Sequence, residues 1–181
     1  MLFRSEETRS DIGHLESILA SLDIATSEDD LTQIKEELIA SGYIRGKGDS
    51  KKRRASKSAP LRFVSSDGFD IYVGKNNYQN DEITFKTANS GDWWFHAKKM
   101  PGSHVIVKCE GKELPDRAFE EAASLAAYFS SGRSMGKVEI DYVKRKEIKK
   151  PSGAKPGFVV YYTNYSMTAN AVIPDGVTAV E

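Results

Sequence analysis

Cysteine, histidine and long apolar runs are scarce in this sequence of 181 residues. One cysteine cannot form an internal disulfide, and one cysteine with three scattered histidines does not make a structural zinc site. No run approaches the roughly 18 apolar residues that a membrane-spanning helix needs. Residues 1–11 are charged rather than an apolar signal segment. We therefore expect a cytoplasmic protein without membrane association, and we predict no metal site and no cofactor.

Net charge is absent as well, because 26 basic and 26 acidic side chains balance. The balance hides an asymmetry: residues 1–44 hold three basic and ten acidic side chains, whereas residues 45–60 hold seven basic and one acidic. The scarcity of apolar side chains in residues 45–60 predicts a basic, flexible linker between two folded parts. Its cluster at 51–54 is either a phosphate-binding element or a solvated hinge.

Two amphipathic helices are predicted before this linker. Both have apolar side chains at three- and four-residue steps, at Ile12, Leu15, Ile18, Leu19 and Leu22, and then at Leu31, Ile34, Leu38 and Ile39. Ser27 is suited to cap the second helix. Residues 1–44 thus form a short helical hairpin, which we interpret as the end of a longer helical region.

Residues 61–181 are expected to form one α+β domain with a mixed, largely antiparallel sheet and one or two packed helices. The predicted strands are 61–64, 69–73, 93–97, 104–109, 137–143 and 158–163, with a weak strand at the C-terminus. Ser65–Gly68 connects the first two strands through an Asp-Gly turn. Helices are predicted at 80–88, where alternation leaves a strand as the alternative, and at 114–130.

Alternation along 93–98 divides two neighbouring tryptophans between opposite faces of the sheet. Trp94, His96 and Lys98 share one face, to which pairing would add His104 from the next strand. Aromatic rings interleaved with cations are typical of a sequence-tolerant RNA surface. The alternative is that a helix covers this face and Trp94 belongs to the core.

Two further segments are candidates for RNA contacts. Residues 74–81 combine a cation with amide side chains at a helix start, which favours binding of phosphate and base edges; the alternative is a capped turn. Residues 133–155 are rich in lysine and arginine, which favours phosphate contacts unless the run is an ordinary solvated face.

The sequence gives less support for a catalytic function. His96 and His104 can act as an acid and base pair in RNA cleavage, but two histidines alone are weak evidence. Cys109 lies on the opposite strand face from His104, so we predict a buried, inert thiol. No catalytic residue is assigned.

Three ordered motifs resemble a known family. Gly74–Asp81, Asp92–Ala97 and Pro101–Ile106 resemble, in this order, the RNA-binding domain NFACT-R of the NFACT family, over residues 61–175. Residues 1–44 resemble the end of the coiled-coil and helical region that precedes that domain. The matching positions are Gly74, Gln79, Asn80, Asp81, Asp92, His96, Ala97 and Gly102, with Trp94 and His104 closer to the bacterial form.

The resemblance implies a part in ribosome-associated quality control. Family members bind the large ribosomal subunit that holds an obstructed peptidyl-tRNA, recruit tRNA and promote template-free addition of residues, alanine in bacteria. The implied partners are tRNA, the RNA of the large subunit, and the family's N-terminal domain, which this sequence lacks. An older family label, fibronectin-binding protein A, gives cell-surface adhesion as an alternative, which the missing signal segment and disulfide disfavour.

We therefore predict a noncatalytic RNA-binding module, with RNA cleavage by His96 and His104 as the alternative. The predicted RNA contacts are Lys75, Asn76, Asn77, Gln79, Asn80, Trp94, His96, Lys98, Lys99, His104, Arg133, Lys144, Arg145 and Lys146.

Overall fold

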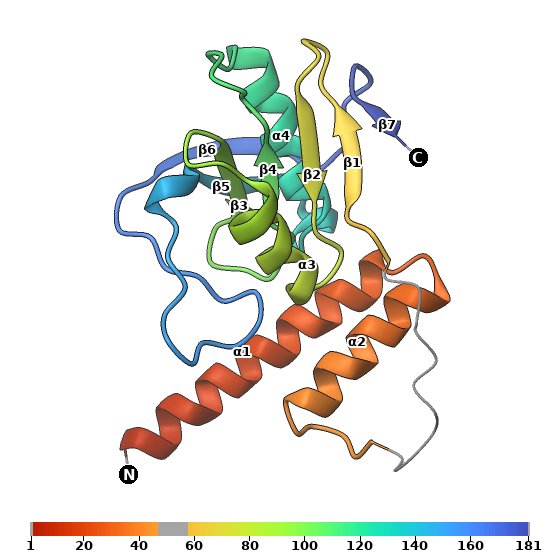
Figure 1. The fold of residues 1–181 in the computed structure, drawn as a ribbon, viewed down its shortest axis with the longest axis vertical. Helices are drawn as coiled ribbons and strands as arrows, with labels where there is room; N and C mark the ends of the chain where they lie inside the picture. The colour runs from red at the N-terminus through yellow and green to blue at the C-terminus, as the bar shows by residue number, and fades with distance from the viewer. Residues whose placement is uncertain (1, 47–57, 181) are drawn as a thin grey trace.

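The computed structural model of the chain describes residues 2–46 and 58–180. A pair of helices precedes a domain of strands and helices, and the N-terminus lies at the far end of that pair (Figure 1). The predicted linker at 45–60 falls mostly outside the described residues. Within 2–46 and 58–180, no helix combines the length and apolar character needed to cross a membrane.

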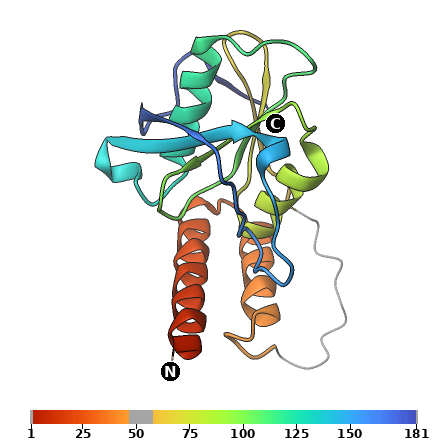
Figure 2. The same ribbon diagram turned by 90° about the vertical axis from the view of Figure 1, so that its left-hand side faces the viewer.

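The helical pair consists of α1 (Leu2–Ile24) and α2 (Glu28–Ala40). Ser27 caps α2 as predicted: its hydroxyl accepts from Asp30 N at 3.2 Å, and Asp30 Oδ2 accepts from Ser27 N at 3.1 Å, which is a capping box. The two helices run side by side below the sheet (Figure 2). Their buried apolar side chains are Ile18, Ala20 and Ile34.

Seven strands form one sheet in the order β6-β5-β3-β4-β2-β1-β7, with every pair antiparallel. Their bounds are β1 Leu61–Val64, β2 Asp70–Val73, β3 Trp93–Ala97, β4 Val105–Val107, β5 Lys137–Lys144, β6 Tyr165–Asn170 and β7 Thr178–Val180. The central strands are covered on both faces. This double cover explains why all three residues of β4 are buried.

Helix α4 (Asp116–Tyr128) packs its alanine-rich face on one side of the sheet, against side chains such as Phe95 and Val107. The other side is covered by α3 (Asn77–Glu82), by the π-helical turn η1 (Ile83–Thr87) and by residues 148–161. Two short 3₁₀ turns, η2 (Arg133–Met135) and η3 (Arg145–Glu147), flank β5.

The α+β class is confirmed, as are the two N-terminal helices, the hairpin at 65–68 and the helical state of 80–88. That helix begins at Asn77, three residues earlier than predicted, because Asn76 caps it: Asn76 Oδ1 accepts from Gln79 N at 3.0 Å. The predicted strand at 158–163 is wrong. This segment makes only one bridge, between Lys149 and Val160, and the edge strand is β6 at 165–170.

Candidate functional site

The amide-rich motif at 74–81 lies between the sheet and the helical pair. Lys75 is buried, and its Nζ lies 2.6 Å from Asp30 Oδ1 of α2, also buried. The amide nitrogens of Asn76 and Gln79 donate to Gln33 Oε1 of α2, at 2.7 and 3.0 Å. The motif therefore binds the helices of this chain.

Asn77 joins the motif to both helices. Its Nδ2 donates to Ser17 Oγ of α1 and to Glu37 Oε1 of α2, each at 2.8 Å. Glu37 Oε1 also lies 2.8 Å from His14 Nε2, and all of these groups except Ser17 are buried. Burial raises the pKa of the Glu37 carboxyl, although hydrogen bonds from Asn77 and His14 oppose that shift.

We therefore correct the expectation that this motif is open to a ligand. Lys75, Asn76, Asn77, Gln79 and Asn80 are all buried. Asn80 is held within the domain, where its Oδ1 accepts from His104 N at 3.0 Å. The sequence contains no local signal for these partners, because Asp30, Gln33 and Glu37 lie some forty residues away in the chain.

The expected open surface around Trp94 is also wrong. Trp94 is 1% exposed and forms a second core with Ile83, Ile106, Val143 and Ile148. The alternative, that Trp94 is covered and belongs to the core, is therefore correct. The covering segments are η1 and residues 148–161, and the ring centroids of Tyr161 and Trp94 are 5.1 Å apart.

The two imidazoles lie beside this core rather than on a free surface. His104 is buried, and its Nδ1 lies 2.8 Å from Thr84 Oγ1. His96 stacks on Trp94 at 5.5 Å between centroids and keeps partial exposure. Burial lowers the pKa of both imidazoles, that of His104 strongly. Because His104 is sealed inside the protein, the two imidazoles cannot flank an RNA phosphate, which removes the basis for cleavage by this pair.

A partly exposed row of aromatic rings lies on the opposite face of the sheet, which carries Trp93. Trp93 is half-buried, and Tyr142 and Tyr165 continue from it across β5 and β6. Tyr142 stacks on Tyr165 at 5.5 Å between centroids with 27° between planes, and Tyr165 is 61% exposed. Lys144 Nζ lies 4.2 Å above the Trp93 ring. We call Trp93, Tyr142 and Tyr165 the aromatic ladder.

Cations adjoin the ladder where β5 ends. Lys144 Nζ donates to Gly91 O at 2.8 Å, and Arg145 Nε donates to Thr84 O at 2.7 Å, so both side chains are fixed by backbone carbonyls. Lys146 is exposed, with Glu147 as its carboxylate neighbour at 3.9 Å. We call Lys144, Arg145 and Lys146 the basic rim.

The remaining predicted cations lie at the other end of β3. Lys98 Nζ donates to Glu139 Oε1 at 2.6 Å, and this hydrogen bond to the carboxylate raises the lysine pKa. Lys99 is exposed in a left-handed backbone conformation, with φ 55°. Arg133 is exposed and lies 3.8 Å over the Tyr128 ring. The predicted contacts thus lie in four separate places: the buried motif at 74–81, the second core around Trp94, the basic rim, and this opposite end of β3.

Metal-binding geometry does not appear in the described ranges, where no three His, Cys, Asp or Glu side chains gather to hold an ion. Cys109 is buried as expected, and burial raises the pKa of its thiol.

Comparison with known proteins gives consistent similarities. Residues 60–163, more than half of the chain, match the family described as NFACT protein RNA binding domain. The chain is 45% identical over 157 residues to the Rqc2 homolog RqcH of Streptococcus suis, covering 86% of this chain and 28% of that protein. It is 35% identical over 175 residues to the Rqc2 homolog RqcH of Bacillus subtilis, covering 96% and 30%. The chain therefore spans less than a third of these relatives.

A solved structure extends the similarity to the fold. The C-terminal part of the fibronectin/fibrinogen-binding protein from Streptococcus suis superposes with a TM-score of 0.83 at 41% identity, covering 92% of this chain and 66% of that chain.

Proposed function

Because the chain belongs to the NFACT family and carries its RNA-binding domain, we propose that it binds RNA without catalysing a reaction, through the aromatic ladder and the basic rim. The observation that carries this assignment is the exposed ring of Tyr165, which stacks on half-buried Tyr142 next to a lysine held over Trp93. Exposed rings stack on unpaired bases, and neighbouring cations neutralise phosphates.

The wider role follows from the relatives named Rqc2 homolog RqcH. We assign the whole protein to ribosome-associated quality control in the cytoplasm. There it binds the large ribosomal subunit that holds an obstructed peptidyl-tRNA, and it recruits tRNA for template-free alanine addition. In this scheme the described domain supplies RNA contacts, and a further N-terminal domain is its partner within the protein.

Binding of fluorescently labelled tRNA and single-stranded RNA to the chain, followed by anisotropy, tests the assigned surface. Replacing the three basic-rim residues by alanine should weaken binding by about tenfold or more at low salt, because each lost cation removes a phosphate contact. A matched triple variant, Arg9→Ala/Lys35→Ala/Lys112→Ala, removes three exposed cations from other elements and should bind as the unchanged chain does.

Arg145 also supports the backbone at Thr84, so folding is checked by circular dichroism. The single variant Lys146→Glu serves as a second measurement, since this exposed side chain makes no hydrogen bond to the described backbone. Equal losses in the two triple variants, or full binding by Lys146→Glu, would contradict the assignment. Fibronectin in place of RNA tests adhesion, and no binding is expected.

A further inference from the structure

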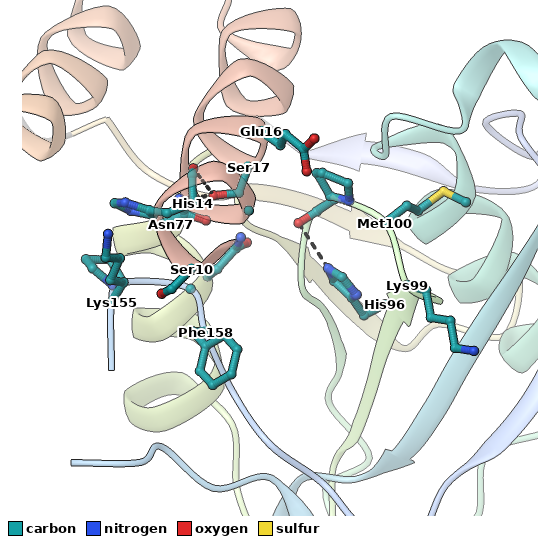
Figure 3. A pocket seen from close by; sticks show the side chains of 16 residues that line it. Ser10, His14, Glu16, Ser17, Asn77, His96, Lys99, Met100, Lys155 and Phe158 are labelled. Carbon is teal, nitrogen blue, oxygen red and sulfur yellow. Dashed lines mark hydrogen bonds between the residues drawn. The ribbon is translucent and has the colours of Figure 1, made fainter. Parts of the chain in front are cut away.

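A cavity of about 330 Å³ lies between α1 and the sheet domain (Figure 3). Its wall comes from four parts of the chain: residues 10–17 of α1, Asn77 and Asn80 of α3, residues 96–102 at the end of β3 and beyond it, and residues 155–158. Figure 3 shows Ser10 and Phe158 on one side and His96 on the other. Neither the aromatic ladder nor the basic rim lines this cavity.

The walls are suited to a flat, partly apolar ring. Met100, Pro101 and Phe158 line the cavity, and Phe158 is 56% exposed. Small-molecule sites are commonly apolar clefts at the junction of two structural units, and about 300 Å³ is the lower end of their size range. A cavity of this size accepts one base with its sugar rather than several nucleotides.

Polar groups in the wall orient such a ligand. Glu16 is an exposed carboxylate that disfavours a phosphate inside the cavity and accepts hydrogen bonds from amino groups of bases. His96 presents a neutral imidazole, since burial lowers its pKa, and Nε2 lies 3.3 Å from Gly102 O. The base therefore belongs inside and the phosphate outside.

One cation for that phosphate lines the cavity, and a second lies in a neighbouring segment. Lys99 lines the cavity and makes no ion pair with any carboxylate of residues 2–46 and 58–180. Arg133 belongs to the neighbouring segment, which is held against the rim by the hydrogen bond from Ser131 N to Pro101 O at 2.9 Å. A left-handed backbone at a lysine is costly and is often found at binding sites.

We propose that this cavity binds one unstacked nucleotide of an RNA, with a base that carries an exocyclic amino group between Phe158 and His96 and its phosphate at Lys99 and Arg133. This inference rests on the proposed RNA binding and adds a base-binding site to it. Along the β3–β5 ladder, His96 of the cavity pairs with Asp141, three residues before Lys144 of the basic rim, which is a separation of about 10 Å. One RNA strand can therefore reach both.

Titration of the ¹⁵N-labelled chain with AMP, GMP, CMP and UMP tests the cavity directly. The amide signals of Lys99, Gly102 and Gly157 should shift with each nucleotide that binds. UMP should bind less tightly than the other three, because uracil has no amino group to donate to Glu16.

A variant can fill the cavity without disturbing its walls. A Cβ at Gly13 meets no heavy atom within 4 Å, and Gly13 lies in the helical interior of α1, where a leucine favours the helix. Gly13→Leu should weaken mononucleotide binding by about tenfold or more, because the leucine side chain fills the cavity. Phe158→Ala should weaken binding by a similar factor, because it removes the ring on which the base stacks. Tyr162→Ala is the matched control, because Tyr162 is 84% exposed and does not line the cavity.

The outcomes separate this site from the proposed function. The proposed nucleotide site is supported if Gly13→Leu loses mononucleotide binding but still binds paired RNA through the basic rim. Wild-type nucleotide binding by Gly13→Leu, or amide shifts confined to other regions, overturns it while leaving RNA binding intact. If neither nucleotides nor RNA bind the unchanged chain, both proposals are wrong.

Discussion

Asp30 illustrates how one carboxylate serves two elements. Its Oδ2 caps α2, and its Oδ1 receives Lys75 Nζ from the far side of the interface. Burial alone would raise the pKa of this carboxyl, but hydrogen bonds from Lys75, Ser58 and Thr26 N outweigh burial and hold it well below the ordinary value.

A pH dependence follows from this carboxylate. A carboxyl whose pKa is lower in the folded state contributes stability above its unfolded pKa and loses it as pH falls toward the folded pKa. Between pH 7 and pH 3 the free energy of unfolding should therefore fall less in Asp30→Asn than in the unchanged chain, by about 1 kcal/mol. Urea unfolding at each pH measures this difference.

Asp175→Asn is the control for the acid dependence, since Asp175 is an exposed carboxylate in the segment before β7. It should keep the pH dependence of the unchanged chain. Equal pH dependence in Asp30→Asn and the control would mean that the buried pair does not contribute to acid unfolding.

Residue patterns predicted the positions of the tryptophans on the sheet but not which of them is covered. Alternation along β3 correctly separated Trp93 from Trp94. Both faces of β3 are packed, however, so the burial of each ring depends on segments far away in sequence. The 148–161 segment covers Trp94. On the other face, Trp93 contacts Phe119 of α4 on one side and the exposed Tyr165 on the other.

At the scale of elements, the cap at Ser27 and the turn at 65–68 were predicted correctly because their causes are local, whereas the cap at Asn76 was not. Ser27 and the turn at 65–68 need only neighbouring residues. The segment at 158–163 alternates like a strand but lies over the Trp94 core, where Val159 and Tyr161 pack, and only one bridge forms. The docking of α1 and α2 was not predictable, since its polar partners are far apart in sequence.

Asn77 gives an experiment on that docking. Asn77→Ala removes the hydrogen bonds to Ser17 and Glu37 and leaves a buried carboxylate with fewer donors. Amide hydrogen exchange should accelerate by about tenfold in α1 and α2, whereas β3 and β5 should keep their protection. Tyr78→Ala, at the exposed neighbouring position, should leave exchange in α1 and α2 unchanged. Uniform acceleration across both parts would contradict a separate docking unit.

At the scale of the whole molecule, one end of β3 and β5 meets the helical pair and the other bears the basic rim. Ile12, Leu15, Leu19 and Leu22 form an exposed apolar row on α1 at three- and four-residue steps. That the helices are the end of a longer helical region stays a prediction, made for a chain that spans less than a third of its relatives. The charge balance hid this organisation, because acidic helices and a basic segment cancel in the sum.

Salt dependence separates the two kinds of RNA contact that the proposed surface combines. Each phosphate contact lowers the slope of log affinity against log salt by about 0.7 for single-stranded RNA, so alanine at all three basic-rim positions should flatten the slope by about 2. Tyr165→Leu removes a stacking ring from an exposed position and should weaken binding at every salt concentration without changing the slope. Anisotropy titrations between about 50 and 200 mM salt measure both quantities. A slope that changes with Tyr165→Leu but not with the basic-rim variant would reverse the roles assigned to ring and cations.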